Sequence, residues 1–357
     1  MIKASAPGKL YITGEYAVLE PDHPAIIVAV DQFITVTLSP SNEEGSIRSS
    51  YSNFLPIPWT RKNGEVFIDE RENPFNYVLQ AIQTTESYVQ EKGKELRFFH
   101  LDIDSNLANS DGRKYGLGSS GAVTVATIKA LLQFYQLPYD AMLIYKLSVL
   151  THLAIGSNGS FGDIAASSFG GWIAYSTFNR QWLIHEMTTH SISKLINQPW
   201  KSLRIESLPE PKELQLIIGW TGSPASTTHL VDQLHEEEEK EQDELFQISF
   251  LQEAKNIVEH TISAFKQQDT LKIMQYIQEY RQLLKQLAQH RHLCIETPTL
   301  SMLCQIANDC GGVGKSSGAG GGDCGIVLLN KKIDNHPLIQ QWKQHHIQRL
   351  PFHVFYY

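Results

Sequence analysis

The pattern of apolar positions in the first forty residues is typical of β-structure. Four apolar and β-branched runs, "IKASA", "KLYIT", "AIIVAV" and "FITVTLS", are separated by Pro7-Gly8, Gly14 and Pro21. Runs of this composition that are bounded by glycine and proline favour strands and tight turns. We therefore predict several short strands in this part of the chain.

Helical periodicity begins at Pro74. The segment "PFNYVLQAIQTTESYVQEKG" repeats its apolar residues at helical intervals between an opening proline and a closing glycine, Gly93. The alternation in "LRFFHLDIDS" predicts a half-buried strand after it. Two further helices are expected at about 119–135 and 140–155, followed by a strand in "GGWIAYST".

The second half of the chain is richer in helix. The run "LQLIIGW" predicts a buried strand, residues 225–289 favour helices, and a strand "CGIVLL", a helix and a last strand follow. The terminal "PFHVFYY" is expected to form a strand packed into the fold, and the acidic run His235–Leu245 a solvated helix face or turn. Because 357 residues exceed the usual size of one core, we expect two domains, at 1–200 and 201–357.

Composition and charge narrow the classes of partner. The net charge of −8 and the pI near 6.0 offer no general attraction for nucleic acid or for anionic membranes. No signal peptide is visible, and the densest apolar run, Ala25–Val30, is too short to span a bilayer. The four cysteines form no CxxC pair, so we expect reduced thiols in a cytoplasmic protein. An anionic ligand would need a local group of donors.

The segment "KYGLGSSGAVTVATIKALL" carries candidate chemistry for binding phosphate. Gly118 and Gly121 let the backbone approach a ligand, and the first amides of the following helix lie at the positive end of its dipole. The spacing is not that of the P-loop, and serines that cap an ordinary helix are an equal alternative for this segment alone. The candidate nucleotide-binding residues are Lys114, Gly116, Leu117, Gly118, Ser119, Ser120, Gly121 and Ala122.

Two other segments contain charged or glycine-rich candidates. In "APGKLYITGEYAV", Lys9 follows a Pro-Gly turn, and Glu15 and Tyr16 follow Gly14, although a lysine beside a turn is by itself a weak signal. In "GGVGKSSGAGGGDCG", eight of fifteen residues are glycine, which costs conformational entropy that a plain connector would not need. Close packing against a ligand or another loop is the favoured interpretation, and a flexible linker is the alternative.

A fourth segment, "GSNGSFGDIAASSFGG", offers a carboxylate. Asp163 follows a loop of glycine, serine and asparagine at the start of a short apolar helix. An aspartate in this position is either a helix N-cap or a catalytic group. Ser157, Asn158 and Ser160 precede it as candidate ligands of a substrate.

In their order along the chain, the four segments resemble the motifs of the GHMP small-molecule kinases. "APGKLYITGEYAV" is similar to the first motif of that family, "GLGSSGA" to its ATP-binding motif, "KSSGAGGGDCGIVL" to its third motif, and "SFGDIAAS" to the segment with its aspartate base. The resemblance implies a two-domain α+β fold with the active site in the cleft between the domains. The N-terminal mixed α/β domain would contain a left-handed β-α-β crossover, and the C-terminal domain would be ferredoxin-like.

The resemblance also implies roles for individual residues. ATP would bind with Mg²⁺ at the loop 116–122, Ser119 or Ser120 would ligate the metal, Asp163 would be the base, and Lys9 would stabilise charge on the transferred group. Cations and hydroxyls elsewhere would hold a small-molecule acceptor. The candidates for this contact are Lys9, Glu15, Tyr16, Ser157, Asn158, Ser160, Ser223, Arg291, His292, Gly318, Ala319 and Gly320, with Lys114 as a further cation.

Two segments bear on the identity of the acceptor. "PGKLYITGEYAVLEPDHPAI" and "GWTGSPASTTHLV" look most like the Gram-positive bacterial branch of the family that phosphorylates 5-phosphomevalonate to 5-diphosphomevalonate. Mevalonate kinases typically have Gly-Glu-His where this chain has Gly14-Glu15-Tyr16. The alternatives are another kinase of the family, acting on mevalonate or a sugar, and a non-catalytic sensor with the same fold. We expect a monomer or a homodimer.

Overall fold

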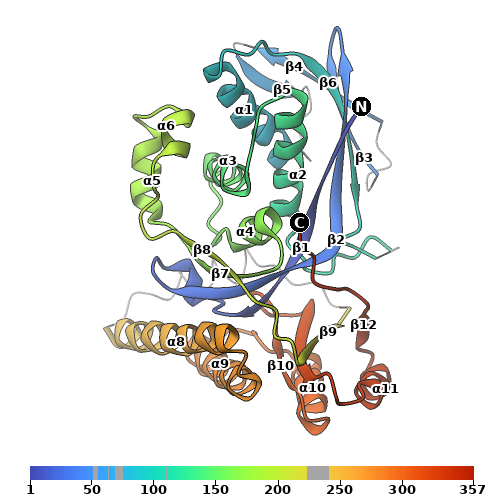
Figure 1. Cartoon of the computed structure of the whole chain (residues 1–357), viewed down its shortest axis with the longest axis vertical. Coiled ribbons are helices and arrows are strands. Elements are labelled where there is room, and N and C mark those ends of the chain that lie inside the picture. The colour runs from blue at the N-terminus through green and yellow to red at the C-terminus, as the bar shows by residue number, and fades with distance from the viewer. Residues whose placement is uncertain (51–54, 63, 69–74, 110, 223–240) are drawn as a thin grey trace.

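The computed structural model describes residues 1–50, 55–62, 64–68, 75–109, 111–222 and 241–357. Within these residues the chain forms two sheets, each with helices packed on it (Figure 1). The acidic run that we expected to be a solvated helix or turn lies mostly outside the described residues, and so does Ser223.

Two long antiparallel strands begin the fold. β1 (Ile2–Thr13) pairs with β2 (Pro24–Ser41) along almost its whole length. The prediction of several short strands is therefore wrong, because the pairing shifts its register between Pro7 and Gly8 instead of turning there. A bulge and a proline are tolerated at this position since β1 is hydrogen-bonded only to β2 among the described strands.

The first sheet contains eight of the described strands, in the order β5-β4-β3-β6-β2-β7-β8 with β1 on β2. Its neighbours pair antiparallel except β3 and β6, which are parallel. Helices α1 to α4 gather on one face of this sheet (Figure 1). The remaining strands are β3 (Gly45–Ser49), β4 (Ile57–Lys62), β5 (Glu65–Ile68), β6 (Phe98–Ser105), β7 (Trp172–Ser176) and β8 (Arg204–Leu208).

The helices expected at 74–93, 119–135 and 140–155 are confirmed as α1, α2 and α3. The start of α3 has a clear cause, since the Asp140 carboxylate accepts a hydrogen bond from the Leu143 amide at 2.7 Å. Two short helices, α5 and α6, follow β7. The bounds are α1 (Asn76–Glu91), α2 (Ser119–Phe134), α3 (Ala141–Ala154), α4 (Gly162–Phe169), α5 (Arg180–Met187), α6 (Ile192–Asn197) and the single-turn η1 (Ala17–Leu19).

The second sheet is antiparallel, in the order β10-β11-β9-β12. Its strands and helices follow one another as in a β-α-β-β-α-β ferredoxin-like unit, as predicted. The strands expected in "LQLIIGW" and "CGIVLL" are confirmed. The bounds are β9 (Leu214–Trp220), α8 (Glu241–Gln267), α9 (Thr270–His290), α10 (Pro298–Asp309), β10 (Val313–Ser316), β11 (Cys324–Asn330), α11 (His336–Gln344) and β12 (Gln348–Leu350).

The two halves share one core. A continuous cluster of buried hydrophobic side chains includes residues of both sheets, and Trp172 of β7 packs on Phe265 of α8 with 5.4 Å between the ring centroids. The end of the chain returns to the first sheet, where the Phe355 amide donates to the Ala29 carbonyl at 3.0 Å. The prediction of a terminal strand is wrong. The segment 351–357 packs on the fold, but its only β-pairing among the described residues is an isolated bridge between Val30 and Val354.

The division into domains at residues 200 and 201 stays a prediction. Because β8 belongs to the first sheet, sheet membership favours a boundary after Leu208. None of the described helices is long and apolar enough to cross a membrane.

Candidate active site

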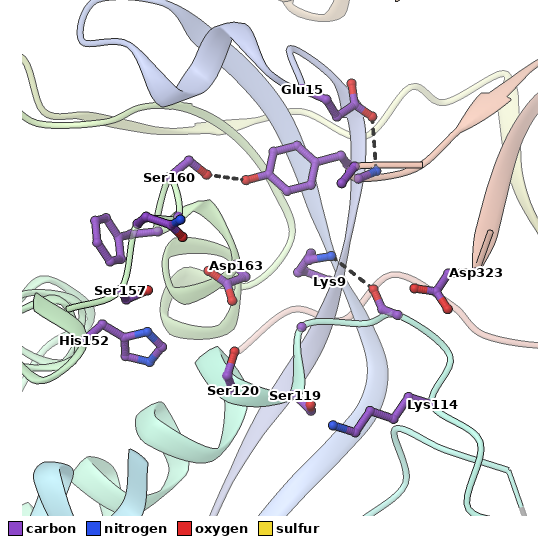
Figure 2. Close-up of a pocket in the computed structure, with 18 of the residues that line it drawn as sticks. Lys9, Glu15, Lys114, Ser119, Ser120, His152, Ser157, Ser160, Asp163 and Asp323 are labelled. Carbon is purple, nitrogen blue, oxygen red and sulfur yellow. Dashed lines mark hydrogen bonds between the residues drawn. The ribbon is translucent and has the colours of Figure 1, made fainter. Parts of the chain in front are cut away.

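A cavity of about 550 Å³ lies where the two halves of the chain meet. Its walls come from β1, the start of α2, the loop before α4 and the segment between β10 and β11 (Figure 2). The structure thus brings together all four motifs of the sequence. The predicted site residues that line the cavity are Lys9, Glu15, Tyr16, Lys114, Gly116, Gly118, Ser119, Ser120, Ser157, Asn158, Ser160, Asp163, Gly318 and Ala319.

The start of α2 is capped by a glycine rather than by a serine. Gly118 has left-handed backbone angles, with φ 76° and ψ 50°, and Ser119 and Ser120 are the first residues of the helix. The capping role that remained open for the serines is therefore wrong. The first amides of α2 have no acceptor within the helix itself, which makes this end of the helix suited to an anion.

The glycines of this segment allow two functional side chains to approach the backbone. A Cβ added at Gly118 would lie 3.1 Å from the Lys9 Cε and 3.1 Å from the Asp163 Cβ. One added at Gly121 would lie 2.7 Å from the Asp163 Oδ2. Leu117 and Ala122 do not line the cavity, because both side chains are buried in the core.

Lys9 extends from β1 toward the phosphate-loop candidate. Its side chain is 8% exposed, and its ammonium donates to the Gly116 carbonyl at 3.1 Å. The Lys9 amide donates to the Leu117 carbonyl at 2.9 Å, so the strand and the loop are joined through both main chain and side chain. In the view of Figure 2, Lys9 lies between Asp163 and Asp323.

Asp163 is the second residue of α4 and not its N-cap. The cap is Phe161, whose φ of 62° is left-handed. The carboxylate lies beside the start of α2 and influences three cavity residues. Burial raises the pKa of Tyr11 and of Tyr77, and the charge of Asp163 raises both further. Burial lowers the pKa of His152, and Asp163 opposes that shift.

The loop before α4 is held by donors behind it. The Tyr175 hydroxyl donates to the Ser160 carbonyl at 2.5 Å, and Arg180 donates to the carbonyls of Ser157, at 3.2 Å, and of Gly159. The Ser160 hydroxyl also lies 2.8 Å from the Tyr11 hydroxyl. Since the carbonyls of this loop are bonded to these donors, the loop is fixed at the cavity wall.

The glycine-rich segment between β10 and β11 forms the opposite wall. The Tyr16 hydroxyl donates to the Ala319 carbonyl at 2.5 Å. Glu15, whose expected contact with the acceptor stays a prediction, borders the cavity and forms a buried ion pair with Lys315. Gly320 does not line the cavity, and a Cβ there would lie 2.1 Å from the Ile295 carbonyl oxygen.

Two expected acceptor residues lie away from the cavity wall. Arg291 is 3% exposed and His292 is exposed with a φ of 52°, and neither is part of the lining. Ten further lining residues were not singled out by the sequence analysis, and those with polar side chains are Tyr11, Tyr77, Arg113, His152 and Asp323. Asp323 had a sequence signal, as the single acid inside the glycine-rich segment.

A second, more apolar cavity of about 360 Å³ adjoins the first. Both cavities are lined by Tyr77, Gly112, Lys114, Ser119 and Ser120, so the start of α2 borders the two hollows. The apolar part of the second lining consists of Ile34, Phe75, Val78, Ile103, Leu107, Ala108 and Val123. This shape suits a ligand with an aromatic part in one hollow and a charged part in the other.

Oxygen ligands for a hard metal ion are present at the main cavity. The hydroxyls of Ser119 and Ser120 and the carboxylates of Asp163 and Asp323 line it (Figure 2). No group of three or more His, Cys, Asp or Glu side chains placed to hold a metal occurs among the described residues. The donor set fits Mg²⁺, which keeps several waters and takes one or two carboxylates together with substrate phosphates.

Comparisons with known proteins agree with this geometry. A family model described as "GHMP kinases N terminal domain" matches residues 76–171. The chain is 36% identical to the phosphomevalonate kinase of Streptomyces sp. (strain CL190), over 97% of this chain and 95% of that protein. The mevalonate kinase of Thermococcus onnurineus is 28% identical over 93% of this chain and 90% of its own length.

A solved structure is similar over the whole chain. It is the Streptococcus pneumoniae phosphomevalonate kinase in complex with phosphomevalonate and AMPPNP, with a TM-score of 0.86, 29% identity, and coverage of 99% of this chain and 100% of that one. The expected two-domain fold is confirmed by this likeness, whereas the left-handed crossover stays a prediction. With this similarity along nearly its full length, the chain belongs to the GHMP kinase family, as a homologue of the phosphomevalonate kinases.

Proposed function

We propose that the protein transfers the γ-phosphoryl group of ATP to 5-phosphomevalonate and forms 5-diphosphomevalonate. The observation that carries this proposal is the full-length similarity to proteins named phosphomevalonate kinases, one of which was solved with phosphomevalonate and AMPPNP. Mevalonate as the acceptor has less support, since the mevalonate kinase relative is less similar. A non-catalytic sensor has no support from these relatives, which are kinases by name.

The nucleotide would bridge the two cavities. Its phosphates would meet the first amides of α2 and the hydroxyls of Ser119 and Ser120, where the helix dipole favours negative charge. The apolar second cavity would take the base, because it is lined by these same serines. Lys114 lines both cavities and could contact a phosphate from either.

Mg²⁺ would be held by Ser119 or Ser120 together with a carboxylate of the cavity and the nucleotide. The ion would neutralise negative charge on the nucleotide phosphates. Lys9 would supply the second positive charge, from the side of β1, to the group in transit.

Asp163 would orient Lys9 and the acceptor more than it would remove a proton. An alcohol acceptor must lose a proton to attack, but a phosphate monoester has a second pKa of about 6 and is mostly deprotonated near pH 7. The place of Asp163 beside Gly118, which also abuts Lys9, supports this role.

The acceptor would lie between the loop of Ser157, Asn158 and Ser160 and the wall formed by Gly318 and Ala319. Tyr175 and Arg180 fix the carbonyls of this loop, and its residues Ser157, Asn158 and Ser160 border the cavity. Arg291 and His292 stay candidates for the acceptor's anionic groups, although neither lines the described cavity.

The proposal is tested by ADP release with Mg²⁺ and one of three acceptors: 5-phosphomevalonate, mevalonate and galactose. We expect kcat/KM for 5-phosphomevalonate to exceed that for the other two by at least about 1000-fold, because a site built for a buried anionic group rejects an analogue that lacks it. Turnover of mevalonate at an equal or higher rate would replace the proposed acceptor. Absence of turnover with all three, together with binding of an ATP analogue, would favour the sensor.

A further inference from the structure

We propose that Glu15, which borders the cavity, and the buried Lys315 form a positioning pair, which acts on the reaction by setting the glycine-rich segment 316–319 against the cavity. This inference rests on the proposed function, because it concerns how the same site is built. It gives Glu15 a role different from the acceptor contact that the sequence suggested.

The pair connects residues 300 positions apart and is shielded from water. Lys315, in β10, is fully buried, and Glu15, in the turn after β1, is 3% exposed. The Lys315 ammonium donates to the Glu15 Oε1 and, at 2.6 Å, to the Ser316 carbonyl. The Gly318 amide donates to the same Glu15 oxygen at 3.3 Å. One carboxylate oxygen therefore receives both the ammonium and the backbone of the cavity wall.

Three further hydrogen bonds surround the pair, and two of them join the same two segments. The Tyr11 amide donates to the Ser317 hydroxyl at 2.9 Å, and the Tyr16 hydroxyl donates to the Ala319 carbonyl at 2.5 Å. From α9, the Tyr280 hydroxyl donates to the Glu15 carbonyl at 2.7 Å. Each residue from 316 to 319 is thus hydrogen-bonded to the pair or to the first motif.

The geometry of the pair is poor if its purpose is stability alone. The Glu15 Oε2 is buried and has no hydrogen-bond partner. A buried ion pair must offset the desolvation of two charges, and it does so only when the remaining oxygens are also bonded. A pair of apolar side chains would stabilise the contact between the turn after β1 and β10 as well as the ion pair does, or better. Positioning explains why charges are nevertheless found here.

The segment held by the pair reaches the catalytic lysine. A Cβ added at Gly318 would lie 4.0 Å from the Lys9 Nζ, so the main chain at Gly318 faces the ammonium directly. Gly318 and Ala319 both line the cavity. A displacement of about 1 Å in such a wall can cost about 100-fold in rate when it changes the alignment of reacting groups. The pair would therefore act on the chemical step.

The test compares three variants of the full chain: Glu15→Gln, Lys315→Met and the double variant. If the two residues act as a unit, each single variant and the double variant should lower kcat by the same factor, about 10- to 100-fold. The KM for ATP should stay within about twofold of the unchanged protein, because the start of α2 is not altered. The double variant should recover thermal stability relative to Lys315→Met without recovering kcat.

A matched control is available in the first half of the chain. Glu86 is 2% exposed and pairs with Arg61, away from both cavities. Glu86→Gln should lower Tm but keep kcat within about twofold. If kcat in the Glu15 and Lys315 variants falls only in proportion to the folded fraction, as in this control, the positioning role is overturned.

A direct role of Glu15 predicts a different pattern. A contact with the acceptor would raise the acceptor KM in Glu15→Gln and leave Lys315→Met near the unchanged protein, which would also overturn the inference. The kinetic comparison uses whichever acceptor the unchanged protein turns over. An incorrect choice of acceptor would therefore alter the proposed function but not the comparison among variants. If the unchanged protein turns over none of the tested acceptors, the positioning role of Glu15 and Lys315 is overturned as well, because there is then no chemical step that the pair could affect.

Discussion

The two glycine-rich segments at the cavity use their glycines in different ways. At the start of α2, Gly118 and Gly121 make room for functional side chains, Lys9 and Asp163. In the denser segment, Gly320 makes room for the Ile295 carbonyl, and Gly325, which is already in β11, makes room for the Leu303 side chain. The denser segment is therefore mostly a packing device, and the sparser one is shaped around the chemistry. Glycine density by itself does not identify a phosphate loop.

The contrast predicts its largest loss of kcat for the variant Gly118→Ala. The added methyl would meet Lys9 and Asp163 at 3.1 Å, and the left-handed φ of 76° adds strain of about 1 kcal/mol. We expect kcat to fall about 100-fold because both side chains must shift. Steady-state ADP release and thermal unfolding would be measured together.

Gly93→Ala is the matched control for that change. Its φ of 71° carries a similar strain, but an added Cβ there would meet nothing within 4 Å. Both variants should lose similar stability, while Gly93→Ala keeps its kcat. Equal kcat values for the two variants would mean that Gly118 does not control the placement of Lys9 and Asp163.

A smaller loss, about 10- to 30-fold in kcat, is expected for Asp163→Asn. If Asp163 orients the reactants, the ratio of the two kcat values should be the same from pH 6.5 to pH 9, since the acceptor phosphate is then largely ionised. Both proteins should slow below about pH 6, where the acceptor itself takes up a proton. A ratio that titrates with one proton and approaches unity once the acceptor is ionised would instead identify a base.

Gly320→Ala should affect activity less and stability more. Its Cβ would lie 2.1 Å from a main-chain oxygen at a φ of 78°, so the backbone must move. We expect about 3 kcal/mol of lost stability, against about 1 kcal/mol for Gly93→Ala. Because Gly320 follows the wall residue Ala319, kcat of the folded fraction should also fall, by up to about tenfold and less than in Gly118→Ala. Urea unfolding with matched kinetics checks this. A loss of kcat as large as that of Gly118→Ala, at unchanged stability, would show that Gly320 shapes the chemistry rather than the packing.

The same contrast explains which parts of the molecule were predictable from sequence. Helices such as α1 and α3 can be predicted because their apolar residues repeat at helical intervals over a few turns. The start of α3 is also set locally, by the N-cap Asp140. The length of β1 did not follow, because Pro7-Gly8 has the composition of a turn and only its pairing with a remote strand makes it a bulge.

The site divides in a similar manner. The residues of each motif were predictable, and most of them line the cavity. Their partners were not, because contacts such as Glu15 with Lys315 join positions 300 residues apart and leave no local pattern. Arg291 shows the converse, since a cation after a long helix is a reasonable ligand by sequence but is buried away from the cavity lining.

The smallest predicted effect is on the pH dependence of Tm, and it concerns His152, which contacts α2 behind the sparser glycine segment. The His152 Nε2 lies 3.0 Å from the Thr124 hydroxyl of α2, and burial lowers the pKa of this imidazole, with Asp163 opposing the shift. As the pH falls below the ordinary histidine pKa of about 6.5, His152 takes up a proton more readily in the unfolded chain than in the folded one. The free energy of unfolding therefore decreases as the pH falls through that range. His152→Asn should reduce the loss of Tm between pH 7 and pH 5. An unchanged loss of Tm would show that His152 takes up its proton equally well in the folded protein, and that the start of α2 does not depend on a neutral imidazole.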